Sequence, residues 1–328
     1  MNLSAAVREN FPSKKIVIVG DLVADQFLRG TIARVSREAP VFILRHDETE
    51  TLAGAAANAA VNVASLRGRA VLVGMVGKDA NGGALVEKLR ASGVDCDFVI
   101  RSGEIKTTTK VRVLAGQHYA PRQQVIRIDY ENEAKISRAI ENRLKKNLLA
   151  AAAEADAIII SDYHYGVASA RIFEAAAAVA RDKKIPLLID SRFRLRDFPG
   201  ATTATPNQDE VEQILGKNFT EAGCAELCRT LGYEALLVTR GNDGMLLIEN
   251  GKTPVSFEAV GAREPIDVTG AGDTVIAAYA LGLASKLSFA ASAGIANHAG
   301  GIVVMKKGTA AVGLDELLVS LEKQMGHG

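Results

Sequence analysis

The chain has 328 residues, 48% of them hydrophobic and 23% charged, and its 39 basic and 38 acidic side chains give a formal net charge of +1. This composition is typical of a soluble globular protein that can bury a sizeable core. The balanced charge gives no support to a nucleic-acid footprint or to attraction by a membrane surface, so we expect neither as a partner. A local basic pocket for a phosphorylated metabolite needs only a few residues.

The N-terminus and the cysteines bear on location. Residues 1–15 mix charges and lack a long apolar core, unlike a signal peptide. The three cysteines are an odd, low number that suits a reducing compartment. Cys224 and Cys228 stand four apart in an expected helix, but no second Cys/His pair completes a zinc site. We therefore expect a cytoplasmic protein whose cysteines are buried apolar residues.

Short apolar runs alternate with helix-competent segments along most of the chain. Lys15–Gly20 and Val71–Val76 are predicted buried strands, and Gly54–Ser65 and Gly82–Arg90 are predicted helices. Further buried strands are predicted at Ala157–Ile160, Pro186–Ile189 and Ala235–Val238. This alternation predicts an α/β fold with a doubly wound, mostly parallel sheet. No polar linker interrupts the chain, so residues 1–328 are expected to form a single domain.

Two segments, Thr31–Arg45 and Lys106–Tyr130, have a period-two pattern instead. Alternating strands are half-buried, with one face on the core and one free. We therefore expect a small antiparallel β lid, formed by about residues 27–50 and 104–131 and inserted in the main domain. Such a lid could close over a ligand, and because exposed strands pair at their edges we also expect a homodimer through it.

Two carboxylates, Asp21 and Asp25, follow the first predicted strand at its carboxyl end, where open α/β sheets bind ligands. Carboxylates there can accept hydrogen bonds from sugar hydroxyls, or they can simply cap the loop. Gly54 and Asn58 lie at the start of a predicted helix. That signal is weak, because an alanine-rich helix needs no ligand to explain it.

The strongest local signal is Asp267-Val-Thr-Gly-Ala-Gly-Asp-Thr274, which precedes the apolar, helix-competent Val275–Ala284. Its glycines therefore lie at a helix N-terminus, whose unpaired N–H groups and dipole attract negative charge. Asp273 would repel a phosphate unless it served as a base or acted through Mg²⁺, and phosphoryl transfer needs a carboxylate that accepts the proton of the attacking hydroxyl. The alternative is a plain turn in which Asp273 caps the helix. The predicted anion hole consists of the N–H groups of Gly270, Ala271 and Gly272.

Other nucleotide-binding motifs do not fit. A Walker-type loop would end at Gly251-Lys252-Thr253, but Leu246 occupies the position of its first glycine. The dinucleotide fingerprint should follow the first strand, where Gly20–Asp25 has only one glycine. An NAD-dependent oxidoreductase is thus disfavoured.

Together these features resemble the ribokinase-like (PfkB-type) carbohydrate kinases over nearly the whole chain. Asp267–Asp273 resembles the family's ATP-side signature D-T-x-G-A-G-D, and Ala53–Asn58 resembles its substrate-side glycine/asparagine signature. Ala55 replaces a usual glycine there, and Arg67 stands where a glycine or serine is expected. The resemblance implies a kinase that uses ATP and Mg²⁺, with a monovalent cation as a further option.

A closer resemblance is to the kinase domain of the bacterial heptose-phosphate kinases, which serve ADP-heptose synthesis for lipopolysaccharide. It implies phosphorylation of D-glycero-β-D-manno-heptose 7-phosphate at O1, giving the 1,7-bisphosphate. Tyr165 stands where this subgroup has a lysine, Asp190-Ser-Arg192 replaces its D-P-K, and added residues around His118–Arg122 lengthen the lid hairpin. The segments that carry the resemblance are Gly20–Asp25, Arg34–Val41, Thr109–Leu114, Gln123–Asp129, Ser161–Tyr163, Thr205–Asn207 and Val238–Arg240.

The resemblance also implies roles for single residues. Glu210, in the pattern N-x-x-E, would hold Mg²⁺ directly or through water, although the same pattern is typical of a helix start. Lys110 and Arg112 share one strand face and would clamp the substrate phosphate, unless that face is simply solvated. The implied sugar-side residues are Asp21, Asp25, Gly54, Asn58 and Asp162. The implied nucleotide-side residues are Asn207, Glu210, Thr239, Arg240, Gly244, Asp267, Thr269 and Asn297.

Two alternatives stay open. A kinase of the same family could act on another sugar, a sugar phosphate or a nucleoside. A catalytically silent nucleotide-binding protein belongs to a different class, but a protein that only binds has no need of the Asp273 carboxylate. Because no nucleotidyltransferase follows the kinase segment, we expect either a stand-alone kinase or a piece of a bifunctional protein.

Overall fold

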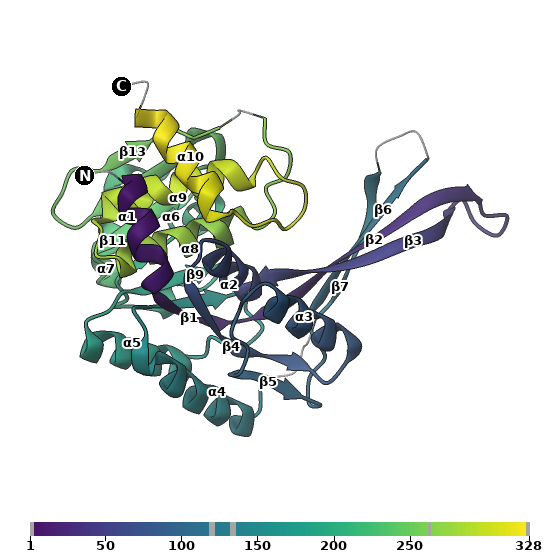
Figure 1. Ribbon diagram of the computed structural model, residues 1–328, viewed down its shortest axis with the longest axis horizontal. Helices are drawn as coiled ribbons and strands as arrows, with labels where there is room; N and C mark the ends of the chain where they lie inside the picture. The colour runs from purple at the N-terminus through teal and green to yellow at the C-terminus, as the bar shows by residue number, and fades with distance from the viewer. Residues whose placement is uncertain (1–2, 118–121, 132–135, 262–263, 326–328) are drawn as a thin grey trace.

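The computed structural model describes residues 3–117, 122–131, 136–261 and 264–325. A main body of helices surrounds a large sheet, and a lid of long strands projects from one side of it (Figure 1). The lengthened hairpin expected around residues 118–122 lies mostly outside the described residues.

In the described part of the chain, the main body contains a sheet of nine strands in the order β13-β12-β11-β10-β9-β8-β1-β4-β5. Neighbouring strands from β11 to β5 are parallel, and β12 and β13 are antiparallel additions at one edge. The predicted doubly wound, mostly parallel sheet is therefore confirmed. The strands are β1 (Lys15–Gly20), β4 (Arg69–Gly77), β5 (Val99–Ser102), β8 (Ala157–Asp162), β9 (Leu187–Ser191), β10 (Thr203–Ala204), β11 (Ala235–Thr239), β12 (Met245–Glu249) and β13 (Val255–Phe257).

Helices cover both faces of this sheet. Successive residues of β1 point to opposite faces, so Ile16 and Ile18 belong to one hydrophobic core and Val17 and Val19 to the other. The first core is completed by α1 (Leu3–Asn10), α2 (Ala56–Ser65), α3 (Ala80–Ala91), α8 (Ala271–Ala284), α9 (Phe289–Val303) and α10 (Leu314–Met325). The second is completed by α4 (Arg138–Ala151), α5 (Ala170–Lys183), α6 (Gln208–Leu215) and α7 (Glu221–Leu231). Short 3₁₀ turns lie at Phe11–Ser13, Ala152–Glu154, Leu195–Asp197 and Gly241–Asp243.

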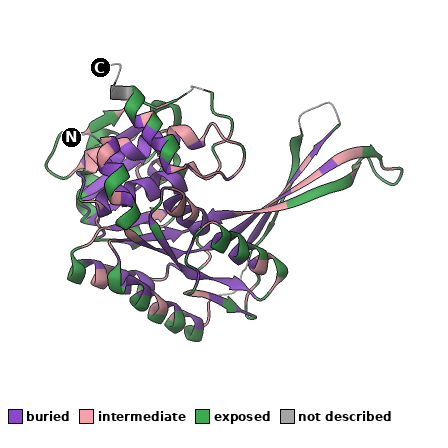
Figure 2. Cartoon of the chain, viewed as in Figure 1, coloured by how far each residue is buried: buried purple, intermediate pink, exposed green. Residues whose placement is uncertain are grey.

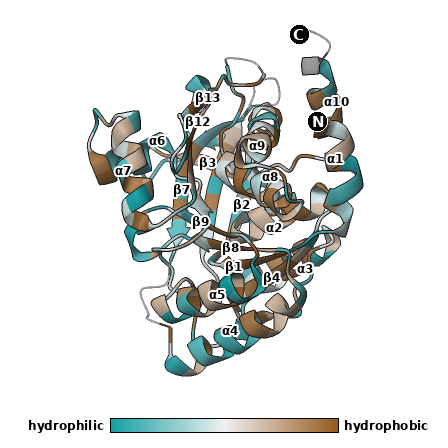
Figure 3. Cartoon of the chain, turned by 90° about the vertical axis from the view of Figure 1, so that its left-hand side faces the viewer, coloured by the Kyte–Doolittle hydropathy of each residue, from teal (hydrophilic) through white to brown (hydrophobic). Residues whose placement is uncertain are grey.

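Coverage on both faces explains the continuous apolar runs of the central strands. In β1 every residue after Lys15 is buried. Figure 2 shows the buried strands between partly exposed helices, and Figure 3 shows the same strands as hydrophobic. A strand that is exposed on one face would alternate instead, as the lid strands do.

The lid is a second sheet, of four strands within the described ranges, in the order β3-β2-β6-β7. Its two hairpins are antiparallel, as predicted, but β2 and β6 pair in parallel where the hairpins meet. The parallel pair is possible because the long segment between β2 and β6 provides the crossover that such a pair needs. The lid strands are β2 (Leu22–Val35), β3 (Phe42–Ala55), β6 (Thr109–Gly116) and β7 (Gln123–Tyr130).

The strands of the first hairpin extend further into the main body than the predicted residues 27–50. β2 starts at Leu22, directly after β1, and β3 runs on to Ala55, which pairs with Leu22. Both residues are buried, whereas the distal ends of the strands are exposed (Figure 2). The helix predicted to begin at Gly54 therefore begins at Ala56, because pairing with β2 outweighs the helix preference of the alanines.

Two residues that replace expected glycines adopt a left-handed backbone conformation. Ala55 precedes α2 with a φ of 56°, and Arg67 follows it with a φ of 64°. A Cβ atom strains the backbone at such angles, so glycine is favoured there. Both substitutions thus carry a conformational cost, one at each end of α2.

None of the described helices is long and apolar enough to cross a membrane. The three cysteines are free and buried, as expected.

We expect Ala55→Gly to stabilise the fold. Relief of a strained φ is worth about 1–3 kcal/mol and the backbone freedom of glycine costs about 0.5–1 kcal/mol, so the free energy of unfolding should rise by about 1 kcal/mol. Urea denaturation followed by circular dichroism measures the change. Ala57→Gly, two residues further on inside α2, is the matched control, and its free energy of unfolding should fall by about 1 kcal/mol. Equal losses in both variants would contradict the prediction.

Candidate active site

Two cavities adjoin at the start of α8. The first has a volume of about 360 Å³ and reaches the lid strands, and the second has a volume of about 520 Å³ and reaches α9. Both lie at the carboxyl end of β11, and the first also reaches that of β9, at the edge where open α/β sheets bind ligands. The residues that line both cavities are Asn207, Thr239, Val268, Ala271 and Gly272.

The turn before α8 is shaped by Asp267. Its carboxylate accepts hydrogen bonds from the N–H groups of Thr269 and Gly308, each at 2.9 Å. Burial acts to raise the pKa of Asp267, but these hydrogen bonds and the charge of Arg112 lower it overall. Asp267 lines neither cavity and holds the turn in shape, whereas Thr269 lines the first cavity. The nucleotide contact of Asp267 stays a prediction.

Gly270 ends this turn with a φ of 79°, and a Cβ atom there would lie 2.5 Å from Nδ2 of Asn58. Ala271 begins the helix, and its N–H already donates to the carbonyl of Val268 at 3.2 Å. Among the described residues, the N–H groups of Gly270 and Gly272 make no backbone hydrogen bond. Two of the three predicted anion-hole donors are thus available, and the third is partly used.

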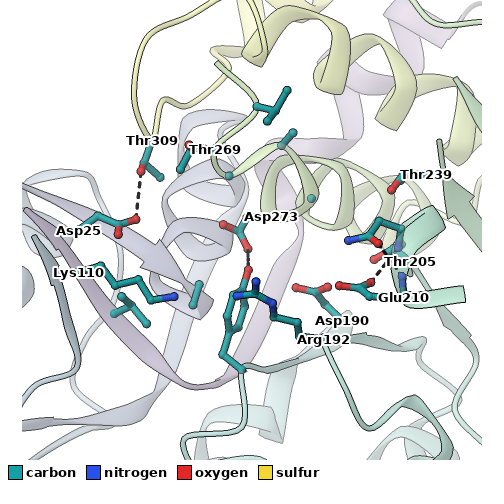
Figure 4. A pocket seen from close by; sticks show the side chains of 18 of the residues that line it. Asp25, Lys110, Asp190, Arg192, Thr205, Glu210, Thr239, Thr269, Asp273 and Thr309 are labelled. Carbon is teal, nitrogen blue, oxygen red and sulfur yellow. Dashed lines mark hydrogen bonds between the residues drawn. The ribbon is translucent and has the colours of Figure 1, made fainter. Parts of the chain in front are cut away.

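Asp273 lies in the first turn of α8, where only 3% of it is exposed. Its Oδ2 accepts a hydrogen bond from Nδ2 of Asn58 at 2.7 Å. Its Oδ1 accepts one from the hydroxyl of Tyr163 at 3.1 Å, drawn as a dashed line at Asp273 in Figure 4. Burial, and then the charge of Asp190, raise the pKa of Asp273 to about 8 against the lowering effect of these hydrogen bonds. A carboxyl group that titrates near neutral pH is suited to accept a proton from a hydroxyl.

Asn58 belongs to a buried polar network between α2 and α8. Nδ2 of Asn62 donates to the backbone carbonyl and to Oδ1 of Asn58, at 3.0 and 3.2 Å. Thr274 donates its hydroxyl to Oδ1 of Asn62 at 3.0 Å. Because Oδ1 of Asn58 is already an acceptor, its Nδ2 is the atom that faces Asp273. Asn58 lines neither cavity but binds the carboxylate of Asp273 directly, and its predicted sugar contact stays a prediction.

Asp190 and Glu210 face the first cavity on the side away from the lid (Figure 4). Glu210 also closes a capping box at the start of α6: its N–H donates to the side chain of Asn207 at 2.9 Å, and the N–H of Asn207 donates to its carboxylate at 2.8 Å. The N-x-x-E pattern is thus both a helix start and part of the cavity wall. Burial raises the pKa of Asp190 to about 8, helped by the charge of Glu210, and raises that of Glu210 to about 7.

These two acids fit a magnesium ion that keeps part of its water shell. Within the described ranges, no group of three or more His, Cys, Asp or Glu side chains could hold a metal alone. Mg²⁺ commonly needs only one or two protein carboxylates when waters and phosphate oxygens complete its octahedron. A cation beside Asp190 and Glu210 would offset the burial and repulsion that raise their pKa values.

Cations line the opposite, lid-facing part of the first cavity. Arg112 pairs with Asp25 at 2.7 Å, and Arg127 pairs with Asp129 at 2.6 Å. These arginines are therefore largely neutralised. In the described part of the chain, the cavity cations without a carboxylate at ion-pair distance are Lys110 and Arg192.

Lys110 is buried on the cavity face of β6. Its Nζ lies 5.8 Å from the ring centre of Tyr163 and 5.9 Å from that of Tyr165. Burial, and then the charge of Arg127, lower the pKa of Lys110. The desolvated ammonium group gains from the aromatic rings but lacks a full counter-charge.

Three further sugar-side predictions fall on residues that line neither cavity. Asp21 accepts hydrogen bonds from three backbone N–H groups of the loop 163–167. Asp162 accepts two hydrogen bonds from one guanidinium group. Gly54 leaves space for Asp25, because a Cβ atom there would lie 2.7 Å from Oδ2 of Asp25. In this structure the three residues hold their neighbours in place, and Asp25 lines the first cavity. The sugar contacts of all four residues stay predictions.

The second cavity gathers most of the residues predicted on the nucleotide side. Gly244 has a φ of 76°, and a Cβ atom there would lie 1.9 Å from the carbonyl oxygen of Phe257, so the turn into β12 requires glycine. Nδ2 of Asn297 donates to the carbonyl of Glu258 at 2.7 Å, which ties α9 to the loop after β13. The predicted residues that line this cavity are Asn207, Thr239, Arg240, Gly244 and Asn297.

Some cavity residues received no role from the sequence. Asp190 and Thr205 stand at or just after the carboxyl ends of buried strands, so the rule that singled out Asp21 could also have found them. Thr309 donates its hydroxyl to Asp25 at 3.2 Å, but the loop that carries it has no recognisable pattern. The first-cavity residues without a predicted role include Tyr163, Asp190, Arg192, Thr205 and Thr309.

Comparison with known proteins agrees with this arrangement. The model of the pfkB family carbohydrate kinases matches residues 13–316. The chain belongs to this family. It is 36% identical over 323 residues to the bifunctional protein HldE of Hahella chejuensis (strain KCTC 2396) and 37% identical over 321 residues to that of Pseudomonas aeruginosa (strain UCBPP-PA14). The alignments cover 97% and 96% of this chain but only 65% of each HldE protein.

Solved structures share the fold. The ribokinase of Arabidopsis thaliana, complexed with ribose and ATP, superposes with a TM-score of 0.70 at 21% identity over 94% of this chain and 98% of that one. Phosphofructokinase-2 from Escherichia coli, in complex with substrates and products, gives 0.75 at 16% identity over 94% and 99%. The protein therefore has a ribokinase-like fold, as the sequence predicted.

Proposed function

We propose that this pfkB-family protein is an ATP-dependent kinase that phosphorylates D-glycero-β-D-manno-heptose 7-phosphate at O1 to give the 1,7-bisphosphate. The observation that carries the proposal is Asp273, a buried carboxylate between a cavity lined with cations and a second cavity at the start of α8. The similarity to bifunctional HldE proteins and the lid motifs support the heptose phosphate.

We place the sugar phosphate in the first cavity and ATP in the second, so that the transferred phosphoryl group lies at the shared wall. Asp273 accepts the proton of the O1 hydroxyl as that oxygen attacks the γ-phosphorus of ATP. The bond from this phosphorus to the bridging oxygen breaks, and ADP leaves. The N–H groups of Gly270 and Gly272 stabilise the negative charge that develops on the moving group.

Asp190 and Glu210 are the residues that would hold Mg²⁺. When bound, the ion supplies positive charge to the phosphate oxygens of the nucleotide. Its presence beside Asp190 also removes part of the negative potential that raises the pKa of Asp273, and so favours the ionised form that a base needs. Activation by a monovalent cation stays a prediction.

The phosphate of the sugar would bind Lys110 and Arg192. Both face the first cavity and neither is paired with a carboxylate in the part of the chain that the structure describes. Arg112, which the sequence grouped with Lys110, is already paired with Asp25. A phosphate therefore gains more from the two unpaired cations.

A pfkB-family kinase for another sugar, sugar phosphate or nucleoside is the alternative. Tyr165 favours it, because it stands where the heptose-phosphate kinases have a lysine. Its hydroxyl donates to Glu131 at 2.6 Å, so this position supplies no positive charge beside Lys110.

The decisive experiment measures ADP release with ATP, Mg²⁺ and a panel of sugars and sugar phosphates. Heptose 7-phosphate should give the highest kcat/KM. Asp273→Asn should lower kcat by about 10²–10⁴-fold, because the base is lost, while the Kd for ATP changes little. Asp315→Asn, at a carboxylate whose side chain is 80% exposed, is the matched control. Near-wild-type kcat in Asp273→Asn would reject the proposed base.

We expect Lys110→Met to separate phosphorylated from unphosphorylated substrates. Loss of a charged hydrogen bond costs about 1.5–3 kcal/mol, so kcat/KM for the sugar phosphate should fall about 10–100-fold. Steady-state kinetics on the unphosphorylated sugar should show little change. Arg122→Met, a lid cation paired with Asp47 outside the cavity, is the control. Equal losses of kcat/KM on the phosphorylated and the unphosphorylated sugar would contradict the binding of the substrate phosphate by Lys110.

We further propose that residues 1–328 form one kinase domain, with the lid of about 27–50 and 104–131 inserted in it. β2 follows β1 after a single residue, which leaves no linker between body and lid. We place the protein in the cytoplasm, where its free cysteines would stay reduced.

A homodimer through the lid is proposed from β7, an edge strand of the lid sheet. Arg127 and Asp129 belong to its cavity face, and apolar residues occupy the other face. Ile126, Ile128 and Tyr130 are 54%, 41% and 55% exposed. A second copy of the chain would bury this row.

Light scattering should therefore find a dimer in the wild type. Replacing Ile126 and Ile128 together by lysine should give a monomer, because two charges would enter the apolar row. Leu149→Lys, at an exposed leucine of α4, is the control and should stay dimeric. A wild-type monomer at high concentration would reject the interface.

A further inference from the structure

We propose that Tyr163 is a positioning residue for the base, and that Asp21 holds Tyr163 in place through its backbone. This inference rests on the proposed role of Asp273. It assigns a task to Tyr163, which received no role from the sequence, and it explains why a buried carboxylate follows the first strand.

Asp21 organises the loop after β8. Its Oδ2 accepts the N–H groups of Tyr163 and Tyr165 at 2.9 and 3.0 Å, and its Oδ1 accepts that of Val167 at 3.0 Å. Alternate N–H groups converge on one carboxylate because the residues between them turn the chain: His164 has a φ of 67° and Gly166 a φ of 103°. Both oxygens of Asp21 are thus used within the protein, and the start of the loop is fixed to the end of β1.

The loop holds the base from the side opposite α2. The hydroxyl of Tyr163 donates to Oδ1 of Asp273 at 3.1 Å, while Asn58 donates to Oδ2 at 2.7 Å. Rotation of the carboxylate would break both hydrogen bonds. The two donors therefore fix the direction of the lone pair that remains for a substrate hydroxyl, and such orientation is worth a large factor in rate.

The lid touches the same ring. Nζ of Lys110, on β6, lies 5.8 Å from the ring centre of Tyr163. The tyrosine is thus held by Asp21 at its backbone, by Lys110 beside its ring and by Asp273 at its hydroxyl.

The surroundings of Asp273 have opposite effects on its pKa. Burial, Asp190 on β9 and Asp25 on β2 favour the protonated acid, and the hydrogen bonds from Asn58 and Tyr163 favour the carboxylate. Removal of the tyrosine hydroxyl should therefore move the titration of Asp273 to higher pH. The other charged groups that line the cavity are Lys110, Arg112, Arg127, Arg192 and Glu210.

The test is the pH dependence of kcat in Tyr163→Phe, measured with saturating ATP, Mg²⁺ and heptose 7-phosphate. In the wild type, kcat should rise with pH as Asp273 ionises. In the variant this rise should lie about one pH unit higher, so that kcat falls about ten-fold at pH 7 and less at higher pH. KM for ATP should change little. A loss that is the same at every pH, or no loss, would overturn the inference.

Tyr165→Phe is the matched control. Its backbone also binds Asp21 and its ring also lies beside Lys110, but its hydroxyl donates to Glu131. Its kcat should rise over the same pH range as in the wild type. Failure of the proposed function gives a different result, because Asp273→Asn would then keep its turnover. If only this inference fails, Asp273→Asn is inactive, but kcat of Tyr163→Phe rises over the same pH range as in the wild type.

A second measurement covers the case in which Tyr163→Phe does not fold. Biosynthetic replacement of tyrosine by fluorotyrosine lowers the pKa of the phenol and strengthens its donation without changing its shape. In the otherwise wild-type chain, this change should move the rise of kcat to lower pH, opposite to Tyr163→Phe. The same shift should persist in Tyr165→Phe. An unshifted rise in the labelled protein would count against Tyr163.

Discussion

The burial of one carboxylate, Asp273, is the constraint on which the rest of the site depends. A charge that is 3% exposed is costly unless hydrogen bonds and dipoles replace the lost water. The first turn of α8, Asn58 and Tyr163 provide that replacement only in part, because the pKa is still raised to about 8. A full ion pair would have lowered the pKa and weakened the base. The nearby Arg112 is paired with Asp25 instead. Asp25 therefore has a cationic partner in the first cavity, whereas Asp273 has only neutral hydrogen-bond donors.

The packing of α2 against α8 makes this compromise possible. Both helices are rich in alanine where they meet the first core, so their backbones approach closely. The polar side chains of Asn58, Asn62 and Thr274 lie in this contact and satisfy one another. Gly270 is required beside them, because any Cβ atom would collide with Asn58. The core and the active site therefore share the same contact, and neither could change without the other.

Much of the fold follows from local pattern, because a strand that is covered on both faces must be apolar throughout. β1, β4, β8, β9 and β11 all satisfy this rule and could be predicted. β10, with two residues, and the edge strand β13, with three, could not, because such short strands carry too little pattern. The lid was recognisable from alternation, but the parallel pairing of β2 with β6 depends on a contact between distant segments.

In the site, too, features that are local in sequence could be predicted, and those that depend on contacts between distant segments could not. The turn at residues 267–273 was recognisable because glycine, acid and helix start are neighbours in sequence. The roles of Asp21 and Asp162 could not be separated from that of Asp25, since a buried carboxylate that binds other protein groups and one that faces a cavity have the same sequence signature. Only the three-dimensional arrangement shows that both oxygens of Asp21 accept hydrogen bonds from the loop 163–167 and that Asp190 faces the first cavity.

The cations that line the first cavity oppose the negative charge around it. Asp25, Asp190, Glu210 and Asp273 already place negative charge around the first cavity. A phosphorylated substrate adds more negative charge. By repulsion this charge would raise the pKa of Asp273 further and leave the carboxyl group protonated, so that it could not accept a proton. Lys110 and Arg192 offset that charge at the point where it enters. On this view the phosphate clamp does more than hold the substrate, because it also keeps the base ionisable when the sugar is bound.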